Sequence, residues 1–275
     1  MSTIRVSLTE EAFKSEVLPF LNTGKRGYVS KIPLYKIFNY ILYRLHTGCQ
    51  WEEMPIETTD EISWWAVYYH FRKWSGDGSL EQVWQHSVEL VKDKLDTSVL
   101  NVDGSHAVAK KGGEAVAYQG RQKAKTSNIL PVTDRNGYIL ATTEIIAGNQ
   151  FDAYELKSHL QEAFNAIKRL GVSIEGTYVN ADSGFDTRDA RKVCFNHHLI
   201  PNIGENKRNP KIAKLGRKRL FNPAFYKDRF ASERTFAWID NFRALLVRFD
   251  LKKIYFMGSH FLAFALINMR NSLVS

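Results

Sequence analysis

Two short segments that each end in an aspartate constrain the fold of this chain more than any other feature. Residues 99–102 lead into Asp103-Gly-Ser, and residues 177–181 lead into Asp182-Ser-Gly. Short, largely apolar runs bounded by turn residues are typical of buried strands. One strand-end aspartate alone is usually a turn residue, because its side chain bonds nearby backbone groups. Two such strands as parallel neighbours would bring both carboxylates to the same edge of a sheet.

The residues before these strands follow a helical period instead. Apolar side chains recur every three or four residues in four segments, at about residues 10–21, 30–47, 64–74 and 79–95. Five of the six tryptophans fall between positions 51 and 84, where large rings can fill a small core. Docking of one helix on DNA is the alternative, but no helix-turn-helix spacing identifies a recognition helix. We therefore expect a small all-helical domain over residues 1–95.

From residue 96 onward the pattern predicts mixed α/β structure. Two strands, at residues 127–132 and 138–146, flank an Asn136-Gly137 turn, which is a strong hairpin signal. A helix is expected after Asp152, a second over residues 186–197, a short strand at 199–203, and a long helix over about 229–247. We assign Asp134 to the hairpin turn and Asp186 to a helix cap, and neither to chemistry.

The composition favours a compact protein with a polyanionic partner. The 275 residues are 44% hydrophobic, and 38 basic against 29 acidic residues give a formal net charge of +9. The alternative is a basic protein that binds no polyanion. Cys49 and Cys194 have neither zinc-site nor disulfide-framework spacing. The first nine residues lack the pattern of a secretory signal, and the apolar run 261–267 is too short to cross a bilayer, so we expect a cytoplasmic location.

Glu233 is a third candidate acid, in the context Tyr226-x-x-Arg229-x-x-x-Glu233. At about 100° per residue, Arg229, Glu233 and Asp240 lie within about 40° of one another on one helix face. An ordinary surface Arg–Glu pair, worth about 0.2–0.5 kcal/mol, is the alternative. Converging carboxylates repel one another, and hard divalent cations relieve that repulsion. Two such ions about 4 Å apart can activate an attacking water and stabilise the leaving oxygen of a phosphodiester.

Together these motifs resemble the DDE transposases of bacterial insertion sequences. The similarity rests on Asp103-Gly-Ser, on Asp182 followed by Gly184-Phe185, and on the Tyr226 motif continued through Glu233-Arg-x-Phe236-x-Trp238. The pattern Trp51-x-x-Met54-Pro55, followed by Trp64 to Trp74, is similar to the helical domain of the branch called IS-five. The match covers about residues 30 to 270.

The resemblance implies an α/β fold with an RNase H-like mixed sheet and flanking helices over residues 96–275. It implies that Asp103, Asp182 and Glu233 are catalytic acids that bind Mg²⁺ or Mn²⁺, with two ions expected, and that Tyr226 and Arg229 contact the DNA backbone. The implied function is cleavage of double-stranded DNA at terminal inverted repeats and transfer of the 3′ hydroxyl to target DNA, by a homodimer at the bacterial nucleoid. A nuclease of the same fold without strand transfer and an inactive DNA-binding relic are the alternatives.

The sequence departs from the family pattern at two places. Relatives often carry a lysine seven residues after the glutamate, where this chain has Asp240, and residues 150–152 read Gln-Phe-Asp where a His-Asp pair is common. Asp240 either leaves this DNA contact without a residue or moves it to Arg234 or Arg243, and we expect Asp240 not to bind metal.

Two basic segments are further candidates for binding phosphates, with solvated loops as the alternative. The segment 106–126, with five Lys or Arg residues, is expected beside Asp103. The other segment is residues 207–219, whose basic residues are Lys207, Arg208, Lys211, Lys214, Arg217, Lys218 and Arg219.

Overall fold

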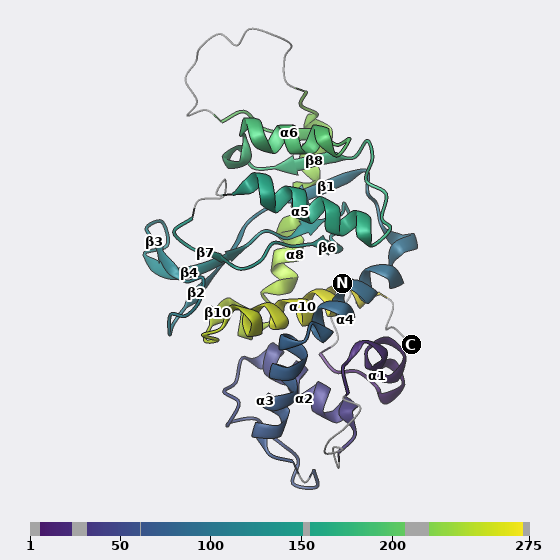
Figure 1. Cartoon of the computed structure of the whole chain (residues 1–275), viewed down its shortest axis with the longest axis vertical. Helices are drawn as coiled ribbons and strands as arrows, with labels where there is room; N and C mark the ends of the chain where they lie inside the picture. Colours follow the sequence, from purple (N-terminus) through teal and green to yellow (C-terminus); the bar gives the residue numbers. More distant parts are fainter. Residues whose placement is uncertain (1–5, 24–31, 61, 151–154, 207–219, 272–275) are drawn as a thin grey trace.

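A five-stranded mixed sheet carries the strand-end aspartates in the computed structural model, which describes residues 6–23, 32–60, 62–150, 155–206 and 220–271 (Figure 1). In spatial order its strands are β6 (Ile139–Ala141), β5 (Val132–Thr133), β1 (Val99–Val102), β8 (Tyr178–Ala181) and β9 (Ile200–Ile203). β1, β5 and β6 pair antiparallel, whereas β1, β8 and β9 pair parallel. This order of strands is that of an RNase H-like domain, so the predicted fold class is confirmed.

The two faces of the sheet differ because side chains alternate along each strand. Leu100, Val102, Val179 and Ala181 belong to one apolar cluster with residues of α5 (Leu156–Arg169) and α6 (Arg188–Asn196). The opposite face carries buried asparagines, and the segments packed near it are α7 (Pro223–Tyr226), the 3₁₀ turn η4 (Lys227–Arg229) and α8 (Phe230–Ile239).

The helices of the N-terminal region share a core with the end of the chain. These helices are α1 (Glu10–Glu16), α2 (Leu34–Thr47), α3 (Trp64–Gly76) and α4 (Ser79–Leu90), with 3₁₀ turns η1 (Leu18–Phe20) and η2 (Lys92–Lys94). The fourteen-residue run of α2 and the tryptophan-rich α3 lie where the periodicity predicts helices. One apolar cluster joins them to α10 (Lys253–Met269), whose residues Ala263, Phe264 and Ile267 are almost completely buried. The domain boundary at residue 95 stays a prediction.

A second sheet lies beside the first, and its existence was not predicted. Its strands are β10 (Val247–Arg248), β2 (Ser105–Ala109), β4 (Ala124–Ile129) and β3 (Ala117–Gln119) in that order, and β7 (Ile146–Ala147) pairs with β4. The expected two-strand hairpin over residues 127–146 is thus split into shorter strands shared between two sheets. The Asp134–Gly137 turn between β5 and β6 is present, as the Asn-Gly pair predicts.

Two expectations about helices are wrong. The long helix expected over residues 229–247 ends at Ile239, where the side-chain amide of Asn241 donates to the carbonyls of Ala237 and Trp238 in the last helical turn. The chain then forms the short helix α9 (Arg243–Leu246) and enters β10. Asp186 does not cap α6, because Thr187 Oγ1 accepts from the Ala190 N–H and the Asp186 carboxylate binds Arg191 at 2.9 Å. The expected helix start at Asp152 lies outside the described residues.

No helix of the described ranges is both long and apolar enough to span a membrane.

Candidate active site

Asp103 and Asp182 lie at the ends of adjacent parallel strands. β1 and β8 pair with Val102 opposite Ala181, so each aspartate is the next residue beyond the last pair. Asp182 is exposed, begins the 3₁₀ turn η3 (Ser183–Phe185), and its Oδ1 accepts from the Ser183 N–H at 2.5 Å. The structure therefore brings two of the three predicted acids to the same edge of the sheet.

Asp103 is half-buried and already has a cationic partner. Its Oδ2 accepts from Nη2 of Arg229 at 3.1 Å, and its Oδ1 accepts from the Gly104 N–H at 2.9 Å. Burial raises the pKa of the Asp103 carboxyl, although Arg229 and the Gly104 N–H act in the opposite direction, and the negative charge of Asp182 adds to the rise. The guanidinium therefore stabilises a carboxylate that its surroundings disfavour.

Arg229 connects Asp103 to Tyr226. Nη1 of Arg229 donates to the Tyr226 hydroxyl at 3.0 Å, and the guanidinium carbon lies 5.4 Å from the centre of the tyrosine ring. Both residues are held by a short turn that runs from α7 through η4. The structure thus places Tyr226 and Arg229 beside the strand-end acids, and their contact with DNA stays a prediction.

A row of asparagines positions this turn, and the sequence reasoning missed it. Asn101, Asn180 and Asn202 are paired side by side across β1, β8 and β9 and are buried. The amide of Asn180 donates to Oδ1 of Asn101 at 3.0 Å, and the amide of Asn202 donates to Oδ1 of Asn180 at 2.7 Å. The signal in the sequence is an asparagine two residues before each strand-end aspartate.

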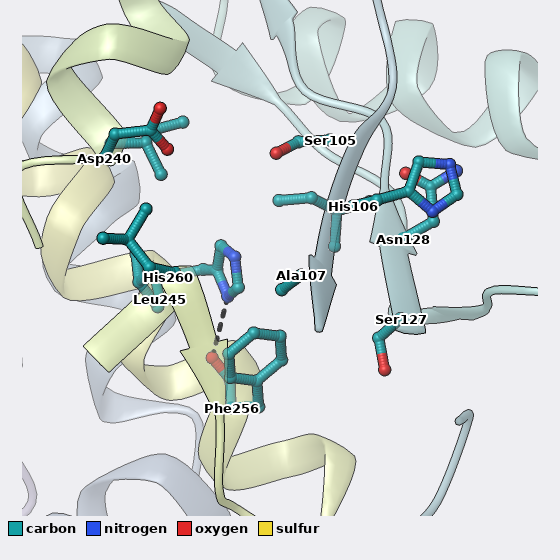
Figure 2. Close-up of a pocket in the computed structure, with 12 residues that line it drawn as sticks. Ser105, His106, Ala107, Ser127, Asn128, Asp240, Leu245, Phe256 and His260 are labelled. Atoms are coloured by element: carbon teal, nitrogen blue, oxygen red, sulfur yellow. Dashed lines mark hydrogen bonds between the residues drawn. The ribbon is translucent and has the colours of Figure 1, made fainter. Parts of the chain in front are cut away.

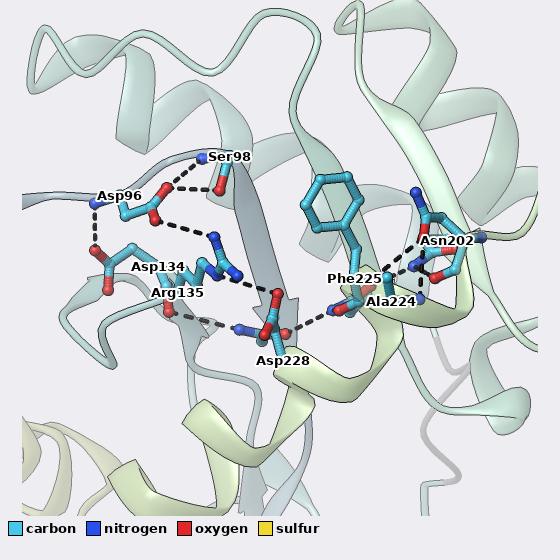
Figure 3. A network of polar contacts seen from close by, with 11 residues as sticks. Asp96, Ser98, Asp134, Arg135, Asn202, Ala224, Phe225 and Asp228 are labelled. Atoms are coloured by element: carbon cyan, nitrogen blue, oxygen red, sulfur yellow. Dashed lines mark hydrogen bonds and ion pairs between the residues drawn. The ribbon is translucent and has the colours of Figure 1, made fainter.

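The same asparagines bind the backbone that precedes Arg229. The Asn180 amide donates to the Phe225 carbonyl at 2.7 Å, and the Asn222 N–H donates to Oδ1 of Asn202 at 2.7 Å, within the network of polar contacts in Figure 3. On the other side of the turn, Nε of Arg135 lies 3.1 Å from the Asp228 carboxylate. Buried polar groups that are fully paired fix one arrangement, so the sheet sets the place of Tyr226 and Arg229.

Glu233 lies on the first turn of α8 with an exposed side chain. Within the described ranges, no three Asp, Glu, His or Cys side chains are grouped closely enough to hold an ion. The strand-end pair Asp103 and Asp182 nevertheless offers oxygen ligands of the type that Mg²⁺ prefers. The pair fits a divalent cation in donor chemistry and in placement, whereas the structure does not bring Glu233 into the group.

The remaining predicted DNA contacts are only partly described. Arg234 donates from Nη2 to the Asn136 carbonyl at 3.1 Å, and its guanidinium carbon lies 5.4 Å from the Trp238 ring. Arg234 therefore lies at the turn between β5 and β6. The basic segment 207–219 lies outside the described residues.

A small cavity of about 50 Å³ separates β2 from the helices α8 and α10. Asp240 and Ser105 lie on opposite sides of it, and His260 reaches it from α10 (Figure 2). His260 Nδ1 donates to the Phe256 carbonyl at 2.9 Å, and burial lowers the His260 pKa to about 4. Burial also raises the pKa of the Asp240 carboxyl. Asp240 therefore lines a cavity beside the second sheet, across from Ser105 at the start of β2.

Two family models match the sequence. The model described as "DDE superfamily endonuclease" matches residues 95–268, and the model described as "Putative transposase of IS4/5 family" matches residues 8–84. No curated protein matches the chain.

Several solved structures of one transposase are similar over much of their length. The Mos1 transposase paired-end complex with left transposon end is 13% identical, with 87% of this chain and 79% of that chain covered and a TM-score of 0.32. The catalytic domain of Mos1 mariner transposase is 13% identical, with 70% and 93% covered and a TM-score of 0.30. The endonuclease match spans most of the chain and contains the strand-end acids. The chain therefore belongs to the DDE superfamily endonucleases and is a DDE transposase.

Proposed function

We propose that this transposase cuts double-stranded DNA at the terminal inverted repeats of an insertion sequence and joins the free 3′ hydroxyl to target DNA. The observation that carries the proposal is the register of β1 and β8, which places Asp103 beside Asp182 with Arg229 bound to the first. Paired carboxylates with an adjacent guanidinium suit a reaction at a phosphodiester, because both the metal ligands and a phosphate partner are within reach.

The acids would hold the divalent metal ions on which DDE endonucleases depend. Asp103 and Asp182 supply oxygens from the strand ends, and we propose that Glu233 supplies the third carboxylate from α8. When bound, the metal lowers the pKa of the attacking hydroxyl or water and stabilises charge on the leaving oxygen.

The protein's own groups orient the DNA. Arg229 is placed to donate to a phosphate oxygen as well as to Asp103, because its guanidinium has five N–H groups in a planar fork. Tyr226 holds that guanidinium and offers a hydroxyl at the same edge. Arg234 and the basic segment 207–219 are proposed to neutralise phosphates further along the duplex, which would position the DNA without reading its sequence.

The acids are tested by isosteric variants. Asp103→Asn, Asp182→Asn and Glu233→Gln should each abolish Mg²⁺-dependent cleavage, because each removes a charged ligand, while DNA affinity and the unfolding midpoint stay near wild type. Cleavage is read from an end-labelled duplex that carries the flanking inverted repeats. Asp189→Asn, an exposed carboxylate on α6, is the matched control and should cleave normally. Substantial cleavage by any of the first three variants removes that residue from the site.

A second measurement separates the transposase from a nuclease of the same fold. A pre-cut duplex with a free 3′ hydroxyl is supplied with a target plasmid, and joined products are counted. Joining that disappears in Asp103→Asn supports the proposal. Cleavage without joining favours the nuclease, and an absence of both with normal DNA binding favours the inactive relic.

A further inference from the structure

Three strands of the second sheet form a ribbon that starts at the candidate active site. β1 ends at Val102 and β2 begins at Ser105, so only Asp103 and Gly104 separate them. β2 and β3 both pair antiparallel with β4. We call residues 105–129 the basic ribbon; its strands extend to the left edge of the molecule in Figure 1, away from the five-stranded sheet.

The register of these strands gathers cations at the far end of the ribbon. Val108 lies opposite Thr126 in β4, and Gln119 lies opposite Ala124. The residues that follow β2, the turn between β3 and β4, and the start of β4 therefore meet at one tip. The tip carries five exposed basic residues, which are Lys110, Lys111, Arg121, Lys123 and Lys125.

The tip has almost no opposing charge within the ribbon. Glu114 is the one acid among residues 105–129, and its Oε2 accepts from the backbone N–H of Lys253 at 3.0 Å. Tyr118 pairs with Lys125 and its side chain is 59% exposed, so the tip also offers an aromatic ring and a hydroxyl. Five exposed cations against a single acid are the kind of charge balance that binds the phosphate backbone.

The distance of the tip from the acids indicates how far along a bound duplex the ribbon would reach. Lys110 lies seven residues beyond Asp103, which at about 3.3 Å per residue is roughly 23 Å. Since B-DNA advances about 3.4 Å per base pair along one strand, that span corresponds to about seven base pairs.

We propose that the tip of the basic ribbon is a second contact with duplex DNA, separate from the metal-binding edge. The proposal rests on the proposed function, since it extends the DNA path away from the acids. It also replaces the expectation that these cations lie beside Asp103. The ribbon holds the duplex about two-thirds of a helical turn from the reacting phosphate, and it does so through phosphates and not through base sequence.

The test is the salt dependence of binding to a 30-base-pair duplex of arbitrary sequence, measured by fluorescence anisotropy with the full chain. The slope of log K against log salt is negative, and each lost phosphate contact makes it less steep by about 0.9. The triple variant Arg121→Gln, Lys123→Gln, Lys125→Gln should therefore make the slope less steep by about 2 to 3. Lys123 has a φ of 51°, and glutamine bears the same backbone cost there, so folding should be unaffected.

Two controls isolate the ribbon. Lys157→Gln, Lys168→Gln, Arg169→Gln removes three exposed cations from α5 and should leave the slope unchanged. The charge-preserving variant Arg121→Lys, Lys123→Arg, Lys125→Arg should retain the wild-type slope. An unchanged slope in the glutamine variant, or an equal loss in the α5 control, overturns the proposal.

Two further measurements distinguish duplex binding by the ribbon from the proposed cleavage activity and from binding of single-stranded DNA. Asp103→Asn should keep the wild-type salt slope, so a cleavage defect with normal binding by the ribbon concerns only the proposed function. A single-stranded oligonucleotide should compete less well than the duplex for wild-type protein, and the glutamine variant should narrow that difference. Tighter binding of the single strand at the tip would overturn the assignment to duplex DNA.

Discussion

Asp134 is a completely buried carboxyl that holds the turn between β5 and β6. Its Oδ1 accepts from the Tyr138 N–H and its Oδ2 from the Asp96 N–H, both at 2.8 Å. Burial raises the Asp134 pKa to about 6, although these hydrogen bonds act in the opposite direction. The residue is thus structural, as the turn sequence predicts, and it titrates in a range where most carboxyls are already ionised.

The raised pKa of Asp134 has a defined effect on stability. Below about pH 4 both folded and unfolded chains carry the proton, and between about pH 4 and 6 only the folded chain retains it, so its contribution to stability falls as the pH rises. The difference in free energy of unfolding between wild type and Asp134→Asn should therefore shrink by up to about 3 kcal/mol from pH 4 to 7. Urea titrations at several pH values measure it, with the exposed Asp93→Asn as control. A difference that is independent of pH would contradict the assignment.

Some residues of the candidate site could be predicted from the sequence alone and others could not. Asp103 and Asp182 could be found because each ends a local run whose pattern is visible within a few neighbours. The resemblance also named Arg229, but its ion pair with Asp103 could not be predicted, because the two residues lie 126 positions apart and no local pattern joins them. The asparagine row is recognisable only once the register of three strands is known, although the spacing of Asn101 to Asp103 repeats in Asn180 to Asp182.

The end of α8 places Asp240 where a positive charge would be more favourable. Asp240 is the C-cap of α8, with its N–H donating to the Phe236 carbonyl at 2.8 Å. A negative side chain there opposes the partial negative charge of the helix C-terminus, an effect of about 0.3–1 kcal/mol. Asp240→Lys should therefore raise the unfolding midpoint slightly, keep cleavage, and tighten DNA binding through attraction to phosphate.

Asp240→Asn distinguishes an effect of the Asp240 charge on DNA binding from a role of Asp240 in the metal site. It removes the charge without adding a cation, so cleavage and affinity should change little. Both variants are measured for cleavage of the labelled duplex and for binding by anisotropy. Loss of metal-dependent cleavage in both, with DNA still bound, would show that Asp240 serves the metal site.

Helices and strands were predicted correctly where apolar residues repeat along one face. They were missed where the structure depends on pairing or packing with segments that are distant in the sequence. The amphipathic helices α2, α4 and α5 and the strands β1, β8 and β9 were found in this way. β2 reads Ser-His-Ala-Val-Ala, which has no clear alternation, and it is a strand because β4 and β10 pair with its backbone. The break after α8 was missed because helical periodicity continues through Asn241 to Phe242, a residue that is fully buried without being helical.

The whole molecule is joined where α10 crosses the N-terminal helices at Gly258. A methyl group on Gly258 would lie 2.9 Å from Cβ of Ser75 and 3.3 Å from Cδ1 of Leu80. Overpacking of this kind typically costs about 1–3 kcal/mol, whereas alanine gains up to about 1 kcal/mol over glycine in a helix. Gly258→Ala should therefore lower the unfolding midpoint, and because one core spans both regions, calorimetry should show a single transition that moves as a unit.

Gly76 provides the matched control, since it ends α3 and a Cβ added there meets nothing within 4 Å. Gly76→Ala should leave the midpoint unchanged or raise it. Two separate transitions in Gly258→Ala, with only one displaced, would show that the N-terminal helices unfold independently of the catalytic sheet.

The ion pair between Asp103 and Arg229 also determines how late in protein synthesis the site can form. Their separation of 126 residues takes a ribosome about 6–25 s at roughly 5–20 residues per second. α10, which completes the core around α2 and α3, is made later still. A growing chain therefore carries Asp103 well before it has the turn that binds this carboxylate. A chain that stops before residue 229 lacks that turn, and we expect such a fragment not to cut DNA.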